Sequence, residues 1–207
     1  MNWLFRKRID RNQWQSEFQS LIESYRSQML WTWDETAQQA PAYFQRLKFS
    51  VGQARGRVLE IGSGIGNMTR WLADSPEVES ILAVDAFPEA INELLTYRLP
   101  KVVGRLAAAN NLTLGSEERF NTVMLCEVIE HLYPDEELAL LRAISPHLER
   151  DAKYVLSTPV GFMADPHHVR GFSRLEFLQH LDKLYGLDAR ICGRVPAWVT
   201  SQVYDKA

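Results

Sequence analysis

The spacing of apolar residues predicts helices in the first quarter of the chain and alternating strands and helices after it. Near the N-terminus, apolar residues recur every three or four positions, which is the period of an amphipathic helix. They are Trp14, Phe18, Leu21, Ile22, Tyr25, Met29 and Leu30. A second helix, with Phe44 and Leu47 on one face, is expected to begin at Pro41, because proline is tolerated in the first helical turn.

From Arg57 onward, short apolar runs alternate with helical segments. We expect strands at 58–61, 81–84, 102–106, 122–125 and 154–156, and two last strands at 189–192 and 199–204. Helices are expected over 67–73, 88–95 and 134–144. Another helix should follow Ser173, which can form a capping box with Glu176. This alternation indicates an α/β fold whose parallel sheet is covered on both faces.

The first predicted strand leads into a glycine-rich loop, which reads Glu60-Ile61-Gly62-Ser63-Gly64-Ile65-Gly66-Asn67. Glycines let the backbone approach a ligand closely, and the start of the next helix offers free N–H groups. The second strand ends in Asp85, whose carboxylate can accept hydrogen bonds from ribose hydroxyls. The third glycine comes one position earlier than in the dinucleotide fingerprint, which disfavours a nicotinamide-dependent dehydrogenase. An ordinary strand-to-helix turn is the alternative interpretation.

Carboxylate and imidazole side chains gather after the fourth and fifth strands. Glu127, Glu130 and His131 follow the fourth strand, and one helical turn would place them on a single face. His168 follows the fifth strand, within the run 165–170. Because both groups come at the carboxyl ends of strands, we expect them to face one crevice. They could bind a divalent cation, or His131 or His168 could act as a general base, or the two glutamates could cap backbone N–H groups.

Other polar residues carry weaker signals. We expect structural roles for His147 and His180, and a small buried side chain at Cys126. Arg170 could pair with an anionic substrate group or remain solvated.

The glycine-rich loop and the second strand resemble the first two motifs of class I S-adenosylmethionine (SAM)-dependent methyltransferases. The run 58–66 is similar to the first motif, and Ala83-Val84-Asp85 with Phe87 to Ile91 is similar to the second. The resemblance covers about residues 55–207 and implies a Rossmann-like sheet of seven strands with an antiparallel last strand. It also implies SAM as the cofactor. The cofactor-binding residues would be Glu60, Gly62, Ser63, Gly64, Gly66, Asn67, Asp85, Ala86, Asn110, Asn111, Cys126 and Glu127.

A second resemblance concerns the segments 127–132, 157–159 and 168–177. They are similar to the ubiquinone-biosynthesis O-methyltransferases and their small-molecule relatives, and to small-RNA 3′-end 2′-O-methyltransferases. In the latter group two glutamates and two histidines hold a magnesium ion. By that resemblance Mg²⁺ or Mn²⁺ would bind Glu127, Glu130, His131 and His168, and the last three would be the catalytic residues.

The resemblance implies methyl transfer to a hydroxyl of a small molecule. The alternatives are an RNA 2′-hydroxyl, a nitrogen or carboxylate acceptor without a metal, and a non-catalytic SAM-binding protein. The net charge of −3 argues against a nucleic-acid partner, because phosphate contacts need lysine and arginine. Residues 1–57 nevertheless hold nine basic and five acidic residues, which keeps the RNA alternative open.

The N-terminal quarter is expected to form a helical cap over residues 1–54, ahead of a methyltransferase domain at 55–207. The cap could be a lid over the crevice, or it could simply pack on the sheet. Trp3-Leu4-Phe5 followed by Arg6-Lys7-Arg8 permits contact with an anionic membrane surface. The chain has two cysteines without a CxxC motif, no signal-peptide pattern and no apolar stretch of membrane-spanning length. These features predict a cytoplasmic protein.

Overall fold

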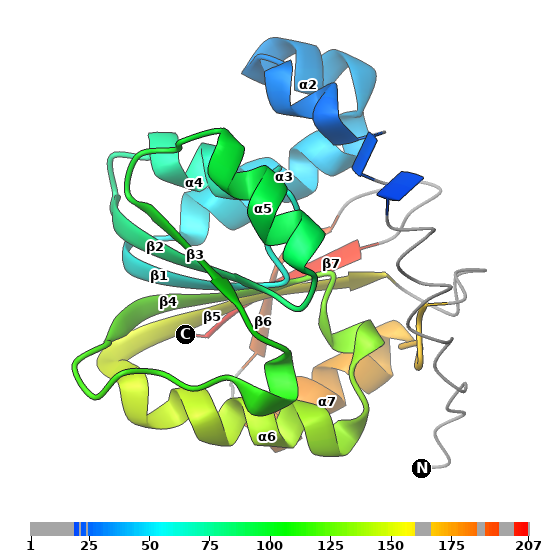
Figure 1. The fold of residues 1–207 in the computed structure, drawn as a ribbon. Helices are drawn as coiled ribbons and strands as arrows, with labels where there is room; N and C mark the ends of the chain where they lie inside the picture. Colours follow the sequence, from blue (N-terminus) through cyan, green and yellow to red (C-terminus); the bar gives the residue numbers. More distant parts are fainter. Residues whose placement is uncertain are drawn as a thin grey trace.

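The computed structural model describes residues 19–20, 22–23, 25–159, 167–185, 189–194 and 201–206, the last two segments as backbone only. Its centre is a sheet in the order β3-β2-β1-β4-β5-β7-β6 (Figure 1). Five strands pair in parallel: β1 (Gly56–Ile61), β2 (Val78–Asp85), β3 (Val102–Leu106), β4 (Phe120–Cys126) and β5 (Leu148–Pro159). The pairs of β7 (Ser201–Lys206) with β5 and with β6 (Ala189–Arg194) are antiparallel. The predicted α/β fold built on a parallel sheet is confirmed.

Helices cover the two faces of this sheet (Figure 1). On one side lie α3 (Pro41–Gln53), α4 (Thr69–Asp74) and α5 (Pro88–Thr96), and on the other lie α6 (Pro134–Ile144) and α7 (Arg174–Tyr185). The described part of the chain also contains short 3-10 turns: η1 (Gln28–Leu30), η2 (Ala109–Asn111), η3 (Ile129–His131) and η4 (Ser145–His147).

The strands divide their side chains between two apolar clusters, because successive residues of a strand point to opposite faces. Leu59 and Val123 pack in the cluster that contains Phe177 of α7. Their neighbours Val58 and Met124 pack in the other cluster, with helix residues such as Leu47. Each face of the sheet therefore has its own buried core.

The N-terminal helix ends earlier than the apolar pattern predicts. Helical residues extend to Arg26, Ser27 is in a turn and η1 follows, so a single helix reaching Leu30 was a wrong prediction. Leu30 is 81% exposed and does not belong to a buried face. Trp14, Phe18 and Leu21 of the same pattern lie outside the described residues, as do the residues of the predicted membrane contact.

The sequence analysis missed α2 (Trp33–Gln39), although its start signal is present. Thr32 precedes the helix, its Oγ1 accepts from the Glu35 backbone N–H at 3.2 Å, and its own N–H donates to Glu35 Oε2 at 2.7 Å. This reciprocal pair is a capping box. The capping box predicted at Ser173 is confirmed, since the Ser173 N–H donates to Glu176 Oε2 at 2.9 Å and the Glu176 N–H to Ser173 Oγ at 3.3 Å.

Part of the predicted cap packs directly on the sheet. Leu47 of α3 is fully buried in the same cluster as Val58 and Met124. Trp33 of α2 meets Phe44 and Trp71 edge-on, with ring centroids 4.9 and 4.6 Å apart. The two helices that begin at Trp33 and Pro41 are therefore extensions of the core.

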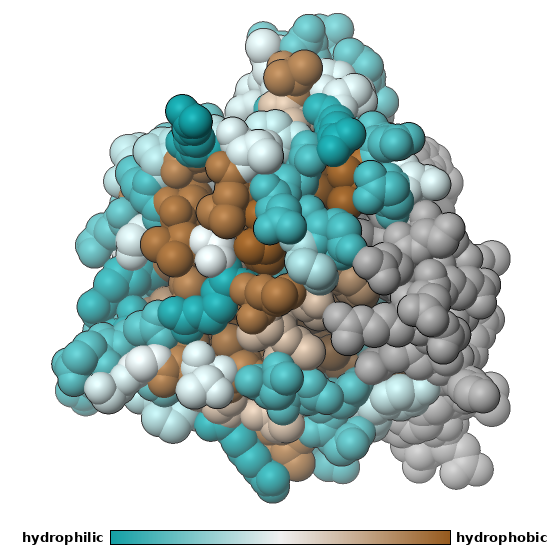
Figure 2. Space-filling model, viewed as in Figure 1, coloured by the Kyte–Doolittle hydropathy of each residue, from teal (hydrophilic) through white to brown (hydrophobic). Residues whose placement is uncertain are grey.

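The β3 edge of the molecule carries an apolar surface. Figure 2 shows brown side chains gathered over α5 and β3, and the large exposed apolar residues of these elements are Leu95, Val103 and Leu106. No helix in the described part of the chain is long and apolar enough to span a membrane.

Candidate functional site

The glycine-rich loop is fixed to the end of strand β2 by its own backbone. The N–H groups of Gly62 and Ser63 both donate to the Val84 carbonyl, at 2.8 and 3.1 Å. Gly66 has a φ of +100°, and a Cβ there would come within 2.5 Å of Leu94 Cδ1. The third glycine is therefore required both by its backbone conformation and by its contact with α5.

Asp85 braces this loop from the end of β2. Its carboxylate accepts hydrogen bonds from the Gly64 N–H at 2.8 Å and the Phe87 N–H at 2.9 Å. Burial raises the pKa of Asp85, and these N–H donors partly oppose that shift. A carboxylate has about four acceptor sites, so Asp85 can also accept from a ligand hydroxyl. The sequence indicated a ribose contact but not this internal role.

Glu60, at the start of the loop motif, is buried within β1. Thr69 donates its hydroxyl to Glu60 Oε2 at 2.7 Å. Burial raises the pKa of Glu60 to about 8, and the nearby charge of Asp85 adds to the rise. Glu60 is therefore mostly protonated at neutral pH. Asn67, at the other end of the motif, donates its side-chain amide to Gln28 Oε1 at 3.3 Å.

A hollow of about 480 Å³ lies where β2 and β3 end. It is lined by Ala86, Pro88, Arg105, Leu106, Ala107, Ala108, Asn111 and Thr113. Two of the expected cofactor-binding residues, Ala86 and Asn111, thus meet at one hollow. Asn110 is turned elsewhere, since its side chain donates to Glu136 Oε1 at 3.3 Å.

An arginine from the N-terminal quarter reaches the end of β4. Arg46 of α3 forms an ion pair with Glu127, with Nη1 2.8 Å from Oε2, and Ser157 donates its hydroxyl to Glu127 Oε1 at 2.8 Å. Arg46 Nε is buried and has no hydrogen-bond partner among the described residues. Burial raises the pKa of the neighbouring Cys126 thiol to about 12, which favours the protonated thiol. No motif indicated Arg46, because its position depends on how α3 packs.

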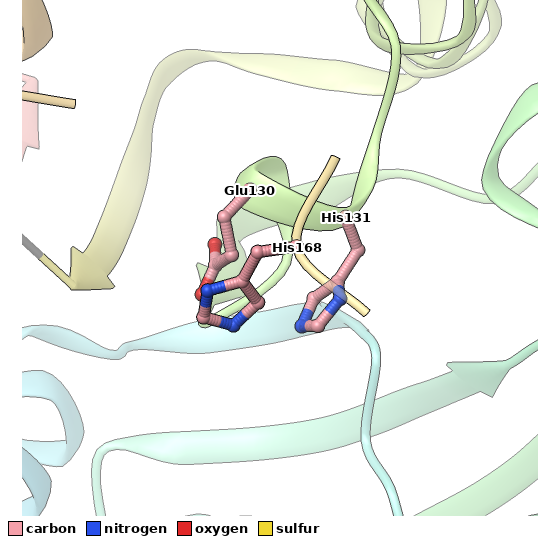
Figure 3. Close-up of side chains that lie close together, drawn as sticks. All are labelled: Glu130, His131 and His168. Carbon is pink, nitrogen blue, oxygen red and sulfur yellow. The ribbon is translucent and has the colours of Figure 1, made fainter. Parts of the chain in front are cut away.

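The side chains of Glu130 and His131, from η3, come together with that of His168 (Figure 3). One ligand atom from each lies within 4.8 Å of the others, and the two imidazole rings meet edge-on with centroids 4.8 Å apart. Glu130 is only 1% exposed; its Oε2 accepts from Thr158 Oγ1 at 3.2 Å, whereas its buried Oε1 has no hydrogen-bond partner among the described residues. Burial raises the pKa of Glu130 well above its usual range, and the charge of Glu127 adds to the shift.

This cluster can hold a cation or a proton. Imidazole nitrogens and a carboxylate oxygen are common ligands of transition metals. A buried carboxylate oxygen without a partner is unfavourable, and a cation or a proton would remove that cost. The donor set and the unpaired Oε1 therefore fit a divalent cation.

Glu127 lies apart from the three clustered residues. The prediction that one helical turn places Glu127 on the same face as Glu130 and His131 is wrong for Glu127, because η3 begins only at Ile129. Glu127 has a φ of +59°, in the left-handed region, and its carboxylate turns to Arg46 instead.

The remaining polar candidates have structural partners. The solvated alternative for Arg170 is wrong, because this side chain is buried and pairs with Glu137. His180 contacts the same carboxylate at 2.9 Å. A ring nitrogen of His147 lies 2.9 Å from the Glu118 carbonyl oxygen. Asp165 of the second predicted cluster lies outside the described residues.

Comparison with known proteins gives one family and several structural relatives. The model of a family described as a methyltransferase domain matches residues 32–189. The structure of a DhpI–SAH complex aligns with a TM-score of 0.67 and 19% identity, over 91% of this chain and 93% of that one. The methyltransferase domain of bacterial CtHen1-C aligns with a TM-score of 0.64 and 19% identity, over 79% and 97%.

A third relative is the glycopeptide N-methyltransferase MtfA complexed with SAM. It aligns with a TM-score of 0.60 and 15% identity, over 77% of this chain and 84% of that one. At these identities the structural matches show the fold. No curated protein matches the chain.

Proposed function

Because this chain belongs to the methyltransferase-domain family, we propose that it transfers a methyl group from SAM to a hydroxyl of a small molecule. The observation that carries the proposal is the glycine-rich loop braced by Asp85 at the end of β2. The DhpI and MtfA structures, which contain SAH and SAM, support the choice of cofactor. We also propose that the fold is the seven-stranded methyltransferase sheet with an antiparallel last strand, which the antiparallel β5–β7 pairing supports.

The residues around the loop fit the parts of SAM. Asp85 has lone pairs for the ribose hydroxyls, and the hollow beside Ala86 and Asn111 suits the adenine. Cys126 and Glu127 would flank the methionine part, and Arg46, which pairs with Glu127 and whose Nε has no hydrogen-bond partner among the described residues, could then bind a carboxylate there. When bound, SAM supplies an electrophilic methyl group on a sulfonium. The chain's task is then to hold the acceptor in line with that methyl and to exclude water.

We further propose that Glu130, His131 and His168 hold a divalent cation, Mn²⁺ or Mg²⁺, on the acceptor side. The donor set and the unpaired Glu130 Oε1 support this assignment. When bound, such an ion lowers the pKa of an acceptor hydroxyl and orients it. Glu127, the fourth predicted ligand, lies outside the set because Arg46 and Ser157 occupy its carboxylate. Without a metal, His131 or His168 would instead accept the hydroxyl proton.

An RNA 2′-hydroxyl is the second candidate acceptor. The resemblance of residues 127–132, 157–159 and 168–177 to small-RNA 2′-O-methyltransferases favours it. The net charge of −3 argues against it, and two arginines outside the N-terminal quarter are neutralised by acids, in the pairs Arg105–Glu118 and Arg170–Glu137. A nitrogen acceptor, as the name of MtfA states for that protein, and a carboxylate acceptor remain metal-free alternatives.

Manganese binding to SAH-saturated protein tests the metal assignment. Electron paramagnetic resonance should show Mn²⁺ bound by the wild type and lost in Glu130→Ala, with SAH affinity unchanged by calorimetry. If the wild type binds manganese, vicinal diols and catechols are the first acceptors to assay. Equal Mn²⁺ binding by the two proteins would remove the metal assignment. Failure to bind SAH would remove the methyltransferase proposal itself, and SAH binding without turnover on any acceptor pool would indicate a SAM-binding protein.

A further inference from the structure

A buried ion pair joins the segment that carries His168 to helix α6. Arg170 Nη2 donates to Glu137 Oε2, and the two side chains are 3% and 0% exposed. Glu137 Oε1 also accepts from the Tyr185 hydroxyl at 2.6 Å and lies 2.9 Å from His180 Nε2. Burial alone would raise the pKa of Glu137, but the hydrogen bond from His180 and the charge of Arg170 lower it to about 2. Glu137 is therefore an ionised anchor in the core.

The same arginine holds the turn that carries Glu130 and His131. Arg170 Nε donates to the Ile129 carbonyl oxygen at 2.8 Å. The backbone N–H groups of Val169 and Arg170 donate to the Glu130 carbonyl, at 3.0 and 3.3 Å. Arg170 and Ile129 are 41 positions apart in the chain, so the register between the two segments depends on these contacts.

We propose that Arg170 is a positioning residue, which sets His168 against Glu130 by bridging the Ile129 carbonyl to Glu137. A guanidinium is a rigid planar fork, so its Nε and Nη2 donors reach two partners at a fixed angle. His168 precedes Arg170 by two residues, and any displacement of the fork moves the imidazole relative to the carboxylate. The proposal rests on the proposed function only in taking the three clustered residues as the reactive site.

Arg170→Lys is the test variant. It keeps the positive charge beside Glu137 but replaces the fork by a single ammonium group, so it cannot hold both partners at the same angle. In metal-free protein at one pH, we expect the NMR resonances of the His168 ring to move toward those of an exposed histidine. In SAH-saturated protein, Mn²⁺ affinity should fall about 10- to 100-fold, as for residues that orient metal ligands. SAH affinity should stay within about twofold, since the glycine-rich loop is untouched.

Tyr185→Phe is the matched control. It removes a hydrogen bond from the same Glu137 carboxylate without touching the Ile129 carbonyl. We expect lower thermal stability with the His168 resonances and Mn²⁺ affinity of the wild type. If this variant moves the His168 ring as far as Arg170→Lys does, general loosening explains the effect and the positioning role is wrong.

The two readouts also separate this proposal from the metal assignment. If the wild type binds no Mn²⁺ but Arg170→Lys still moves the His168 ring, the metal assignment fails and the positioning role stands. If the ring resonances do not move, the positioning role is overturned whatever the metal does. Glu137→Asp, which keeps the charge but draws the fork away from Ile129, serves as a second variant and should move the same resonances.

Discussion

The glycine-rich loop is held in place by its own backbone N–H groups, whereas the Glu130–His131–His168 cluster is built from side chains of two distant segments. The loop is closed by neighbours in one βαβ unit, Val84 and Asp85. The cluster instead depends on Arg170 and Glu137, which lie behind it in the core. We call the glycine-rich loop with Asp85 the donor half of the proposed site, and the Glu130–His131–His168 cluster with Arg170 and Glu137 the acceptor half. The donor half is thus built within one βαβ unit, and the acceptor half is built by long-range packing. The two halves should therefore fail separately when mutated.

The largest effect should come from Glu137→Leu, which removes the anchor of the acceptor half. Arg170 would be left buried without its counter-charge, and breaking a buried pair in this way costs about 3–5 kcal/mol of unfolding free energy. Urea unfolding measures this loss. SAH affinity of the fraction that stays folded should remain close to that of the wild type. The double variant Glu137→Leu with Arg170→Met should recover much of the stability, and a single-variant loss below about 1 kcal/mol would contradict the anchoring role.

The donor half contains the buried acid Glu60. Its titration should give the next largest effect, a dependence of the unfolding free energy on pH. Glu60 has a folded pKa of about 8, above its usual value of 4.5. The folded state therefore holds this proton where the unfolded state has released it, and Glu60 lowers stability as pH rises from about 4.5 to 8. The slope approaches 1.4 kcal/mol per pH unit. Urea unfolding at pH 5, 6, 7 and 8 should show a smaller decline in Glu60→Gln, and an identical decline would contradict the buried, protonated state.

A crossed pair of variants tests whether the two halves bind independently. Asp85→Ala should weaken SAH binding by about 1–3 kcal/mol, the cost of lost hydrogen bonds to a charged group, and leave Mn²⁺ binding intact. Glu130→Gln should abolish Mn²⁺ binding and leave SAH affinity intact. Calorimetry for SAH and electron paramagnetic resonance for Mn²⁺ measure the four combinations. Loss of both ligands in either variant would show that the halves are coupled.

The sequence predicts the donor half well because its signals are local. The contacts between the loop and Asp85 span 21 positions within one βαβ unit, and the Ser173 capping box spans three. The parallel sheet follows from the alternation of strands and helices. The helix at Trp33 was not predicted, because the apolar pattern indicated one helix up to Leu30 and a second from Pro41, although Thr32 and Glu35 carry a helix start signal.

The acceptor half was predictable only in outline. Parallel strands bring their carboxyl ends to one edge, which is why Glu130, His131 and His168 meet as the sequence suggested. The left-handed backbone of Glu127 and its pairing with Arg46 depend on the packing of α3, which periodicity does not report. The burial of Arg170 likewise depends on Glu137, 33 positions away.

The smallest effect should distinguish two glycines within the donor half. Gly64 has a φ of +55°, and a Cβ there meets nothing within 4 Å, so Gly64→Ala should cost about 1 kcal/mol of unfolding free energy, the strain of a left-handed residue. Gly66→Ala should cost more, because φ is +100° and Leu94 Cδ1 would lie 2.5 Å away. Adding Leu94→Ala should relieve the steric part of the Gly66 cost while leaving the strain. Equal costs at the two glycines in urea unfolding would mean that the loop shifts to accept a side chain, and the donor half would then be less rigid than its hydrogen bonds indicate.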